Sequence, residues 1–509
     1  MLKKSTFVLQ VLLLVILFAG QTNAQGTRLL RQPSISTNAI TFVYGADIWV
    51  VSKNGGEAKR ITSTAAVEQD PHFSPDGKTI AFTSNRSGIN AVYVVSTEGG
   101  IPTRLTWYPA PAFARGWTPD GKKVVYASSR EAAPTGYNRL WTVSKSGGPS
   151  SLIPAPFAYD GAIAEDQKSI VIDRVSRWDV EWRHYRGGQN TPLRIMDLKS
   201  LSEKEIPNHG EMDKFPNWIG KNVYFLSDRN FIMNVFAYQS SDGSVKQITH
   251  LSKGDIKWLS GNGKELVFEQ NGYIHVLDPN TGVSKQLDIN VNGDFPWAET
   301  KWENVTKTIE NASLSPTGKR IIMESRGDIF TAPIENGDIR NITKSSGAAD
   351  RRPIWSNDGK QIAYFSDKED DSYALYITDQ EGKSTSKKIN IGDSKLAWST
   401  CWSPNNKFIA FVDNAVRIKV IELATGKITL ADIGGTNIER DNMSLSWSPD
   451  SKWLLYTKTA PNNFRRITVW SLESGKVTPL TDPMADAISP AWDANGRYVY
   501  FLASTNKAL

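Results

Sequence analysis

The side chains that could act as nucleophiles, bases or metal ligands are few in this 509-residue chain, and they form no catalytic pattern. No Gly-x-Ser-x-Gly segment is present, so the exposed serine of an α/β-hydrolase core is not expected. The histidines show neither the His-x-x-x-His spacing nor a glutamate-paired spacing that binds metals. They are His72, His184, His209, His250 and His275. We therefore predict no catalytic residue, no metal site and no cofactor, and we expect the histidines in turns or on the surface.

The single cysteine, Cys401, directly precedes Trp402 in a segment that is expected to be a strand. One cysteine cannot form an intramolecular disulfide, and no second cysteine is available to complete a zinc site. We therefore predict a buried structural thiol rather than a nucleophile. Aspartates are abundant, but most of them lie in Asp-Gly turns, where the carboxylate caps the backbone.

One phrase recurs along the chain and predicts how these residues are positioned. It consists of an aromatic residue, Ser or Thr, a Pro-Asp-Gly-Lys turn, and then a β-branched and aromatic run. Clear copies begin at Phe73, Trp117, Leu314, Trp355, Trp402 and Trp447, and weaker copies are centred on Ser36, Ala164, Ile219, Ser260 and Asp493. The eleven copies are spaced by about 46 residues on average, which is typical of β-propeller blades.

Each repeat contains enough strand signals for one four-stranded blade. Pro-Asp-Gly forms a tight turn, because proline fixes φ and glycine tolerates positive φ, so its flanks should pair as a hairpin. In the second copy the strands after the turn are expected at 80–82, 92–95 and 103–106. No segment beyond the amino terminus shows sustained helical periodicity. The sequence therefore predicts an all-β fold.

Eleven blades exceed the usual four to eight of one ring, so the repeats must be divided between two rings. The interval from 260 to 315 is long, and residues 288–311 carry no blade pattern. We predict a six-bladed propeller over 25–289, a connection over 290–312, and a second propeller over 313–509 with about five blades. The long interval from 164 to 219 has another cause, because residues 177–188 form an insertion within the fourth blade.

Two sets of aromatic residues have different interpretations. One position of the repeat holds tryptophan in five copies, which predicts a packing layer rather than a ligand site. These residues are Trp117, Trp355, Trp402, Trp447 and Trp492. The insertion breaks the repeat and mixes aromatic residues with arginines, including Trp182, Tyr185 and Arg186. It is either an ordinary structured loop or a docking site for another domain or subunit.

The amino terminus has the pattern of a secretory signal peptide. Lys3 and Lys4 precede an apolar run over 7–20, and small residues follow at 22–24. We predict cleavage after Ala24 and a periplasmic or secreted mature protein without a membrane span, because the run is shorter than the roughly 20 residues that a span needs. A retained amino-terminal anchor helix is the alternative.

Composition and charge exclude several classes of protein. Hydrophobic residues make up 39% and charged residues 22%, as in ordinary globular proteins, so a disordered or polytopic membrane chain is disfavoured. Lysine and arginine number 59 against 53 acidic residues, and the basic residues are scattered. A nucleic-acid partner is therefore not expected.

Two unequal rings, the seam between them and the Tyr-Arg-Gly-Gly insertion at 185–188 resemble the amino-terminal half of the tricorn-type serine peptidases. The resemblance covers essentially the whole mature chain and implies a six-bladed propeller followed by a seven-bladed one. In that family PDZ-like and peptidase domains come later, so the resemblance implies a truncated second ring here and missing catalytic domains as partners. A closed five-bladed second ring is the structural alternative.

The function implied by the resemblance is gating. The family's propellers filter oligopeptides on their way to a buried active site, and the resemblance allows a homo-oligomer. The family anchors a peptide carboxyl terminus with two arginines near the third blade, where this sequence offers only Arg115. Arg115 is therefore either a substrate contact or a plain strand-end arginine. Whether the chain itself is an enzyme stays open. The alternatives are a stand-alone periplasmic TolB-type propeller that binds proteins, and a propeller for carbohydrates or small ligands.

Overall fold

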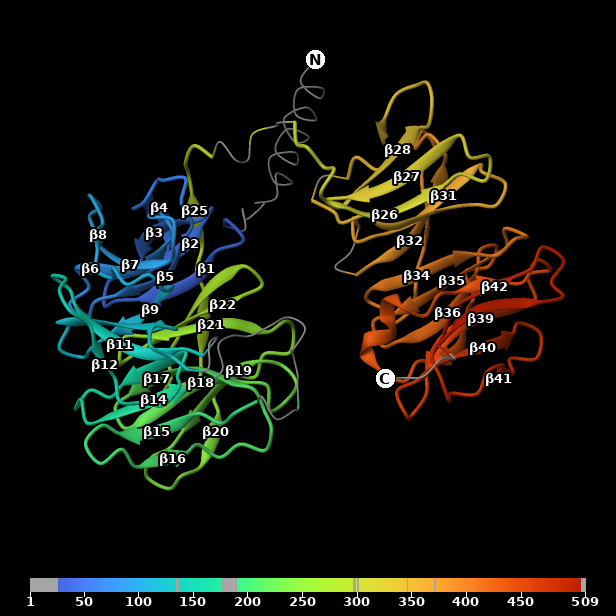
Figure 1. The fold of residues 1–509 in the computed structure, drawn as a ribbon. Helices are drawn as coiled ribbons and strands as arrows, with labels where there is room; N and C mark the ends of the chain where they lie inside the picture. The colour runs from blue at the N-terminus through green and yellow to red at the C-terminus, as the bar shows by residue number, and fades with distance from the viewer. Residues whose placement is uncertain are drawn as a thin grey trace, which may run out of the picture. The chain divides into compact units, whose positions relative to one another are not determined.

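The computed structural model describes residues 26–133, 137–174, 186, 190–295, 299, 302–345, 347–369 and 372–504. The chain divides into two compact units, Met1–Glu299 and Thr300–Leu509 (Figure 1). Nearly all regular structure is β, and the helical element of the described residues is one short 3-10 helix, η3 (Asn437–Asp441). The prediction of an all-β tandem propeller fold is confirmed. In the parts of the chain that are described, no helix has the length and apolar character needed to span a membrane.

Unit 1 contains six sheets, each with four consecutive antiparallel strands that run from the innermost to the outermost position (Figure 1). Sheets 1 to 3 comprise β1 (Arg31–Ile35), β2 (Ala39–Tyr44), β3 (Asp47–Ser52), β4 (Gly56–Arg60), β5 (Glu68–Phe73), β6 (Thr79–Ser84), β7 (Ala91–Ser96), β8 (Thr103–Arg104), β9 (Ala112–Trp117), β10 (Lys123–Ser128), β11 (Arg139–Ser144) and β12 (Ser151–Leu152). Sheets 4 to 6 comprise β13 (Asp160–Ile163), β14 (Ser169–Asp173), β15 (Arg194–Asp197), β16 (Glu203–Glu205), β17 (Asp213–Ile219), β18 (Asn222–Ser227), β19 (Asn234–Tyr238), β20 (Val245–Gln247), β21 (Ile256–Gly261), β22 (Leu266–Gln270), β23 (Tyr273–Leu277) and β24 (Ser284–Gln286).

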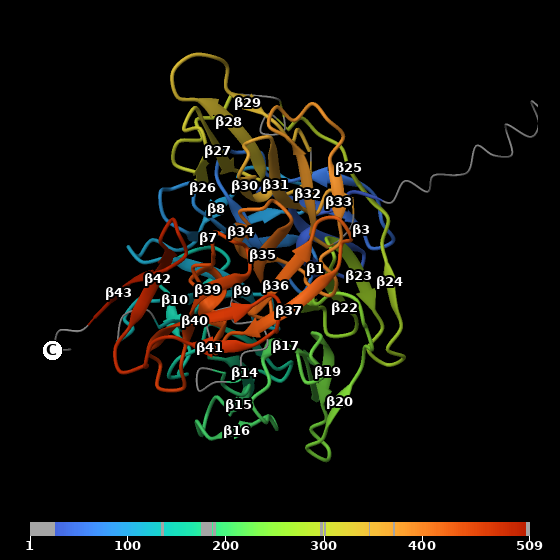
Figure 2. The same cartoon turned by 90° about the vertical axis from the view of Figure 1, so that its right-hand side faces the viewer.

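Unit 2 contains four four-stranded sheets and one two-stranded sheet among its described residues (Figure 2). The first two sheets comprise β26 (Ile309–Leu314), β27 (Arg320–Ser325), β28 (Asp328–Pro333), β29 (Arg340–Asn341), β30 (Arg351–Trp355), β31 (Gln361–Ser366), β32 (Ala374–Asp379) and β33 (Lys387–Ile389). The others comprise β34 (Ala397–Trp402), β35 (Phe408–Asp413), β36 (Arg417–Glu422), β37 (Ile428–Ile433), β38 (Ser446–Trp447), β39 (Trp453–Thr459), β40 (Arg465–Ser471), β41 (Val477–Pro479), β42 (Ala487–Trp492) and β43 (Val499–Ala503).

The repeated Ser-Pro-Asp-Gly phrase forms the turn between the first two strands of a sheet. In the second sheet the Ser74 hydroxyl donates to Asp76 at 2.5 Å and accepts the amide of Thr79 at 3.0 Å, while Asp76 accepts the amide of Lys78 at 3.1 Å. The hydrogen bond from Ser74 holds the pKa of Asp76 below its ordinary value. Asp120, Asp358 and Asp450 repeat this arrangement. The phrase recurs because its side chains close the turn.

The ends of unit 1 meet at its first sheet. Strand β25 (Ile289–Val291) pairs in parallel with β4, which is the outermost strand of that sheet. The Thr27 amide donates to the carbonyl of Ile289 at 2.8 Å, and the Val291 amide donates to the Thr27 hydroxyl at 2.9 Å. One buried cluster joins Phe42 of the first sheet to Val267 of the sixth. Packing and strand pairing therefore close this ring.

The recurring tryptophans lie between neighbouring sheets, as predicted for a packing layer. Trp355, Trp402 and Trp447 are each 6% exposed. The Trp355 indole N–H donates to the carbonyl of Ser313 in the preceding sheet at 3.1 Å. Trp117, Trp447 and Trp492 make the same kind of bond to the sheet before them. Each of these indoles thus combines apolar packing with one directed bond across a sheet junction.

Candidate functional site

The innermost strands of unit 1 bulge at the level of the central channel. Register shifts interrupt their pairing in five of the six sheets on the inner strand itself, for example between Gln69 and His72 in β5. In the third sheet the extra residue is Arg115 of β9, since Val125 pairs with Gly116 and Tyr126 pairs with Ala114. A bulge rotates the following side chains and strengthens the local twist. Gln32, Asp70 and Phe215 adopt φ values of 51° to 54° at these bulges, which non-glycine residues seldom do.

The fourth sheet differs from the others, because β13 pairs with β14 in continuous register from Asp160 to Ile163. Inner-strand bulges therefore occur in β1, β5, β9, β17 and β21. The channel wall is assembled mainly from bulged strands.

A cavity of about 430 Å³ occupies the channel and is lined by residues from every sheet of unit 1. Each innermost strand contributes to the wall, with Ser34, His72, Arg115, Asp160, Phe215 and Trp258 as representatives. Main-chain turns of the Ser-Pro-Asp-Gly type also line it, including those at Pro75 and Pro119. The site is therefore a property of the whole ring and not of any single sequence motif.

Ion pairs link neighbouring sheets around this channel. Arg31 of the first sheet pairs with Glu269 of the sixth. Arg115 of the third pairs with Asp70 of the second at 3.1 Å. The Lys214 ammonium of the fifth pairs with Asp173 of the fourth at 3.1 Å, and both side chains are nearly buried. Basic and acidic groups thus alternate around the ring, and each pair joins two blades.

Arg115, the predicted candidate for a substrate contact, lies in the channel wall. Its side chain is only 5% exposed. Besides the pair with Asp70, its Nε donates to the carbonyl of Tyr159 at 2.9 Å and its Nη1 to that of Ala114 at 2.7 Å. The guanidinium carbon also lies 4.2 Å from the centre of the Tyr159 ring. These contacts give Arg115 a structural role at the junction of three sheets, and its contact with substrate stays a prediction.

Burial shifts the ionisation of the groups near Arg115. Desolvation raises the pKa of Asp160 to about 6, although Arg115 acts in the opposite direction. Desolvation lowers the pKa of His72 to about 4, with Asp70 opposing and Arg115 reinforcing that shift. His72 is therefore neutral at physiological pH. The expectation that the histidines lie in turns or on the surface was wrong for His72, which lies in β5, and for His275, which lies in β23 and stacks on Phe268.

The other predicted site residues fall in different places. Cys401 lies in β34, and burial raises the pKa of its thiol to about 11, in agreement with a structural thiol. Trp182 and Tyr185 lie outside the described residues. Arg186 donates from Nη1 to Asp228 Oδ2 at 2.8 Å and from Nη2 to the Asp228 carbonyl at 3.2 Å. Arg186 is thus tied to the loop after β18. Among the described residues no group of three or more potential metal ligands comes together.

Comparison with known proteins agrees with this architecture. Residues 27–283 match the model of the tricorn protease N-terminal β-propeller domain, and residues 309–506 match that of the tricorn protease second β-propeller domain. The chain belongs to the tricorn protease family. Both propellers of the family are thus represented in these 509 residues.

Individual relatives show the extent of the match. The tricorn protease homolog of Saccharolobus solfataricus is 26% identical over 93% of this chain and 43% of its own length. Tricorn protease homolog 1 of Streptomyces coelicolor is 24% identical over 95% of this chain and 46% of its own length. A crystal structure of the tricorn protease superposes with a TM-score of 0.56 and 20% identity, over 94% of this chain and 46% of that one. The chain therefore spans less than half the length of these relatives.

Proposed function

We propose that this chain is the propeller region through which an exported tricorn-like serine peptidase admits or releases oligopeptides. The observation that carries the proposal is the channel cavity of about 430 Å³ lined by all six sheets of unit 1. A polar channel of this kind offers backbone and side-chain hydrogen bonds to a peptide in many registers. Such contacts favour passage over tight binding of one ligand.

Catalysis is assigned to a peptidase unit outside these 509 residues. The sequence has no nucleophile elbow, and the relatives named as tricorn proteases are more than twice as long as the region they share with this chain. His72 and Cys401 are unsuited to catalysis. Desolvation lowers the pKa of His72 to about 4, which makes it a weak base, and raises the pKa of the Cys401 thiol to about 11, which leaves little thiolate at neutral pH. Oligopeptides are the proposed substrates, and export follows from the predicted signal peptide.

Peptide cleavage tests this proposal. The chain is purified without residues 1–24 and assayed on a pool of unstructured oligopeptides, beside the same chain joined to a tricorn-type peptidase unit. We expect cleavage only by the joined form. Cleavage by the propeller chain alone would show that a catalytic site lies within these residues and would refute the assignment. Cleavage by neither form, with both folded, would favour a binding propeller instead.

A further inference from the structure

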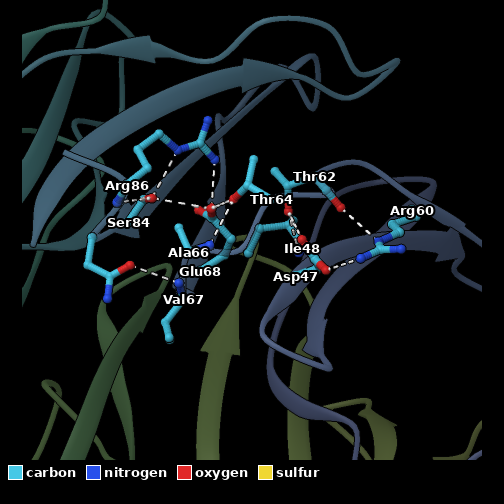
Figure 3. A network of polar contacts seen from close by, with 11 residues as sticks. Asp47, Ile48, Arg60, Thr62, Thr64, Ala66, Val67, Glu68, Ser84 and Arg86 are labelled. Atoms are coloured by element: carbon cyan, nitrogen blue, oxygen red, sulfur yellow. Dashed lines mark hydrogen bonds and ion pairs between the residues drawn. The ribbon is translucent and has the colours of Figure 1, made fainter. Parts of the chain in front are cut away.

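The junction between the first two sheets of unit 1 contains two arginines whose charges are balanced by buried carboxylates (Figure 3). Arg60 pairs with Asp47 at 2.5 Å, and Arg86 pairs with Glu68 at 2.7 Å. The two carboxylate side chains are only 4% and 0% exposed. Thr64 and Ser84 add hydrogen bonds to Glu68 at 3.1 and 3.2 Å. In this junction each guanidinium is thus paired with a carboxylate of the protein itself.

The junction between the second and third sheets has the same arrangement of residues, 44 positions later in the sequence. Arg104 and Arg130 take the positions of Arg60 and Arg86. The Arg104 Nε donates to the carbonyl of Thr106 at 2.7 Å, as the Arg60 Nε does to Thr62 at 3.0 Å. The local hydrogen bonds at Arg130 also agree, since its amide donates to the Ser128 hydroxyl at 3.1 Å and that of Arg86 to Ser84 at 3.2 Å. The two junctions therefore share one backbone geometry.

The acidic partners are missing from the second junction. Ala91 stands 44 residues after Asp47, and Ala112 stands 44 residues after Glu68. Both alanines are buried, at 2% and 3% exposure. Among the described residues Arg104 forms no ion pair, and the ion pair of Arg130 is with the neighbouring Glu131, whose side chain is 51% exposed. The second junction thus has both cations but neither of the two internal carboxylates.

The second junction also differs from the first by two aromatic residues. Trp107 and Tyr108 stand where the first junction has Ser63 and Thr64. The Arg104 guanidinium lies 4.5 Å from the centre of the Trp107 ring, and that of Arg130 lies 4.5 Å from the Tyr108 ring. Trp107 is 72% and Tyr108 44% exposed. We call Arg104, Trp107, Tyr108 and Arg130 the arginine–aromatic patch.

We propose that the arginine–aromatic patch binds an acidic polypeptide segment, whose side-chain carboxylates take the place that Asp47 and Glu68 fill in the first junction. Arginine presents a planar fork that matches a carboxylate with two hydrogen bonds, and it keeps its charge when stacked on an aromatic ring. Exposed tryptophan and tyrosine beside arginine supply the apolar contact area that is typical of energetic hot spots. An acidic side chain is favoured because such a side chain fills the equivalent place in the first junction. This inference does not depend on the proposed peptidase function.

Binding of a defined acidic peptide tests the proposal. The probe is a fluorescein-labelled, C-amidated peptide of three Glu-Gly-Phe-Gly repeats, and its control carries glutamine in place of glutamate. Fluorescence polarisation is measured on the full chain at low ionic strength. We expect saturable binding of the acidic peptide and at least about tenfold weaker binding of the glutamine peptide. We expect a similar loss with Arg104→Gln combined with Arg130→Gln, and a weakening of the wild-type complex as salt is added.

A matched variant and a reverse variant separate the patch from general charge effects. Arg28→Gln with Lys204→Gln removes the same charge from two other cations of unit 1 that lie near aromatic rings, and it should leave the affinity within about twofold. Ala91→Asp with Ala112→Glu restores the internal carboxylates and should abolish binding while the thermal unfolding of the chain is retained. Absence of binding by the wild type, equal binding of the glutamine peptide, or unchanged binding by Arg104→Gln with Arg130→Gln would overturn the proposal. Binding only of a peptide with a free carboxyl terminus would overturn it as well.

Discussion

Replacing Arg115 with methionine tests whether the buried ion pairs stabilise the first propeller. The substitution leaves the Asp70 carboxylate with an 8% exposed side chain and without its cation. It also removes the hydrogen bonds to the carbonyls of Tyr159 and Ala114. Breaking a buried ion pair by removing one partner costs about 3–5 kcal/mol. Thr83 still donates to Asp70 at 3.1 Å, and methionine retains most of the side-chain volume. We therefore expect a loss in the free energy of unfolding at the lower end of this range, about 3 kcal/mol.

Hydrogen exchange of the full chain, followed by mass spectrometry, measures this loss where it occurs. A cost of about 3 kcal/mol reduces amide protection in β5 and β9 by about two orders of magnitude. Protection in unit 2 should not change, which provides an internal control. Asp70→Asn combined with Arg115→Met should recover part of the loss, because a neutral amide is less costly to bury than a carboxylate.

A second control uses an exposed ion pair. Arg340 and Glu381 have side chains that are 45% and 44% exposed, so Arg340→Met should produce little change. A loss of protection of less than about threefold in unit 1 after Arg115→Met would refute the reasoning, since it would show that the pair with Asp70 contributes little to stability.

Three further outcomes follow from particular contacts. The pKa of His72 is about 4 in the folded state and about 6.5 in the unfolded chain, so the wild type loses stability as pH falls from 6.5 to 4. His72→Gln lacks this loss. Denaturant titrations should therefore show a free energy of unfolding that rises by about 2–3 kcal/mol relative to wild type over this range. Trp355→Phe should cost about 1 kcal/mol more than Trp402→Phe in the same assay, because the Trp355 indole donates to a carbonyl, whereas the buried Trp402 indole N–H has no hydrogen-bond partner among the described residues. Equal costs would contradict this. Gly382→Ala should lower the melting temperature more than Gly475→Ala. A Cβ at Gly382 would lie 2.6 Å from a carbonyl oxygen, whereas the space at Gly475 is open. The reverse order would contradict this.

The repeat made the strands and turns predictable from the sequence. The expected second strand at 80–82 lies within β6, and the Ser-Pro-Asp-Gly phrase forms the turn before it. Local residues determine both features, because proline, glycine and the capping hydroxyl act within five positions. The tryptophan layer was also predictable, since a residue that recurs at the same position of several repeats packs in the same way in each of them.

The channel and its ion pairs could not be predicted in this way. Arg31 and Glu269 are separated by 238 positions, and Arg115 and Asp70 meet only because adjacent blades place their inner strands side by side. The bulges that position these side chains have no sequence signature as strong as a turn. Aspartates in the repeat were expected mainly in turns, whereas Asp70, Asp160 and Asp173 lie in the strands of unit 1.

The most direct test of the proposed gating role is to obstruct the channel of unit 1 in a form joined to the peptidase unit. Lys264 is exposed and lines the channel cavity, so Lys264→Cys provides an attachment point for a maleimide polymer. The Cys401 thiol reacts slowly, because its pKa is raised to about 11. Lys476→Cys, at an exposed position of unit 2, is the control. If peptides pass through the channel, modification at position 264 lowers kcat/KM for oligopeptides by about tenfold or more, and modification at position 476 does not. Unchanged turnover after complete modification at position 264 would contradict the account.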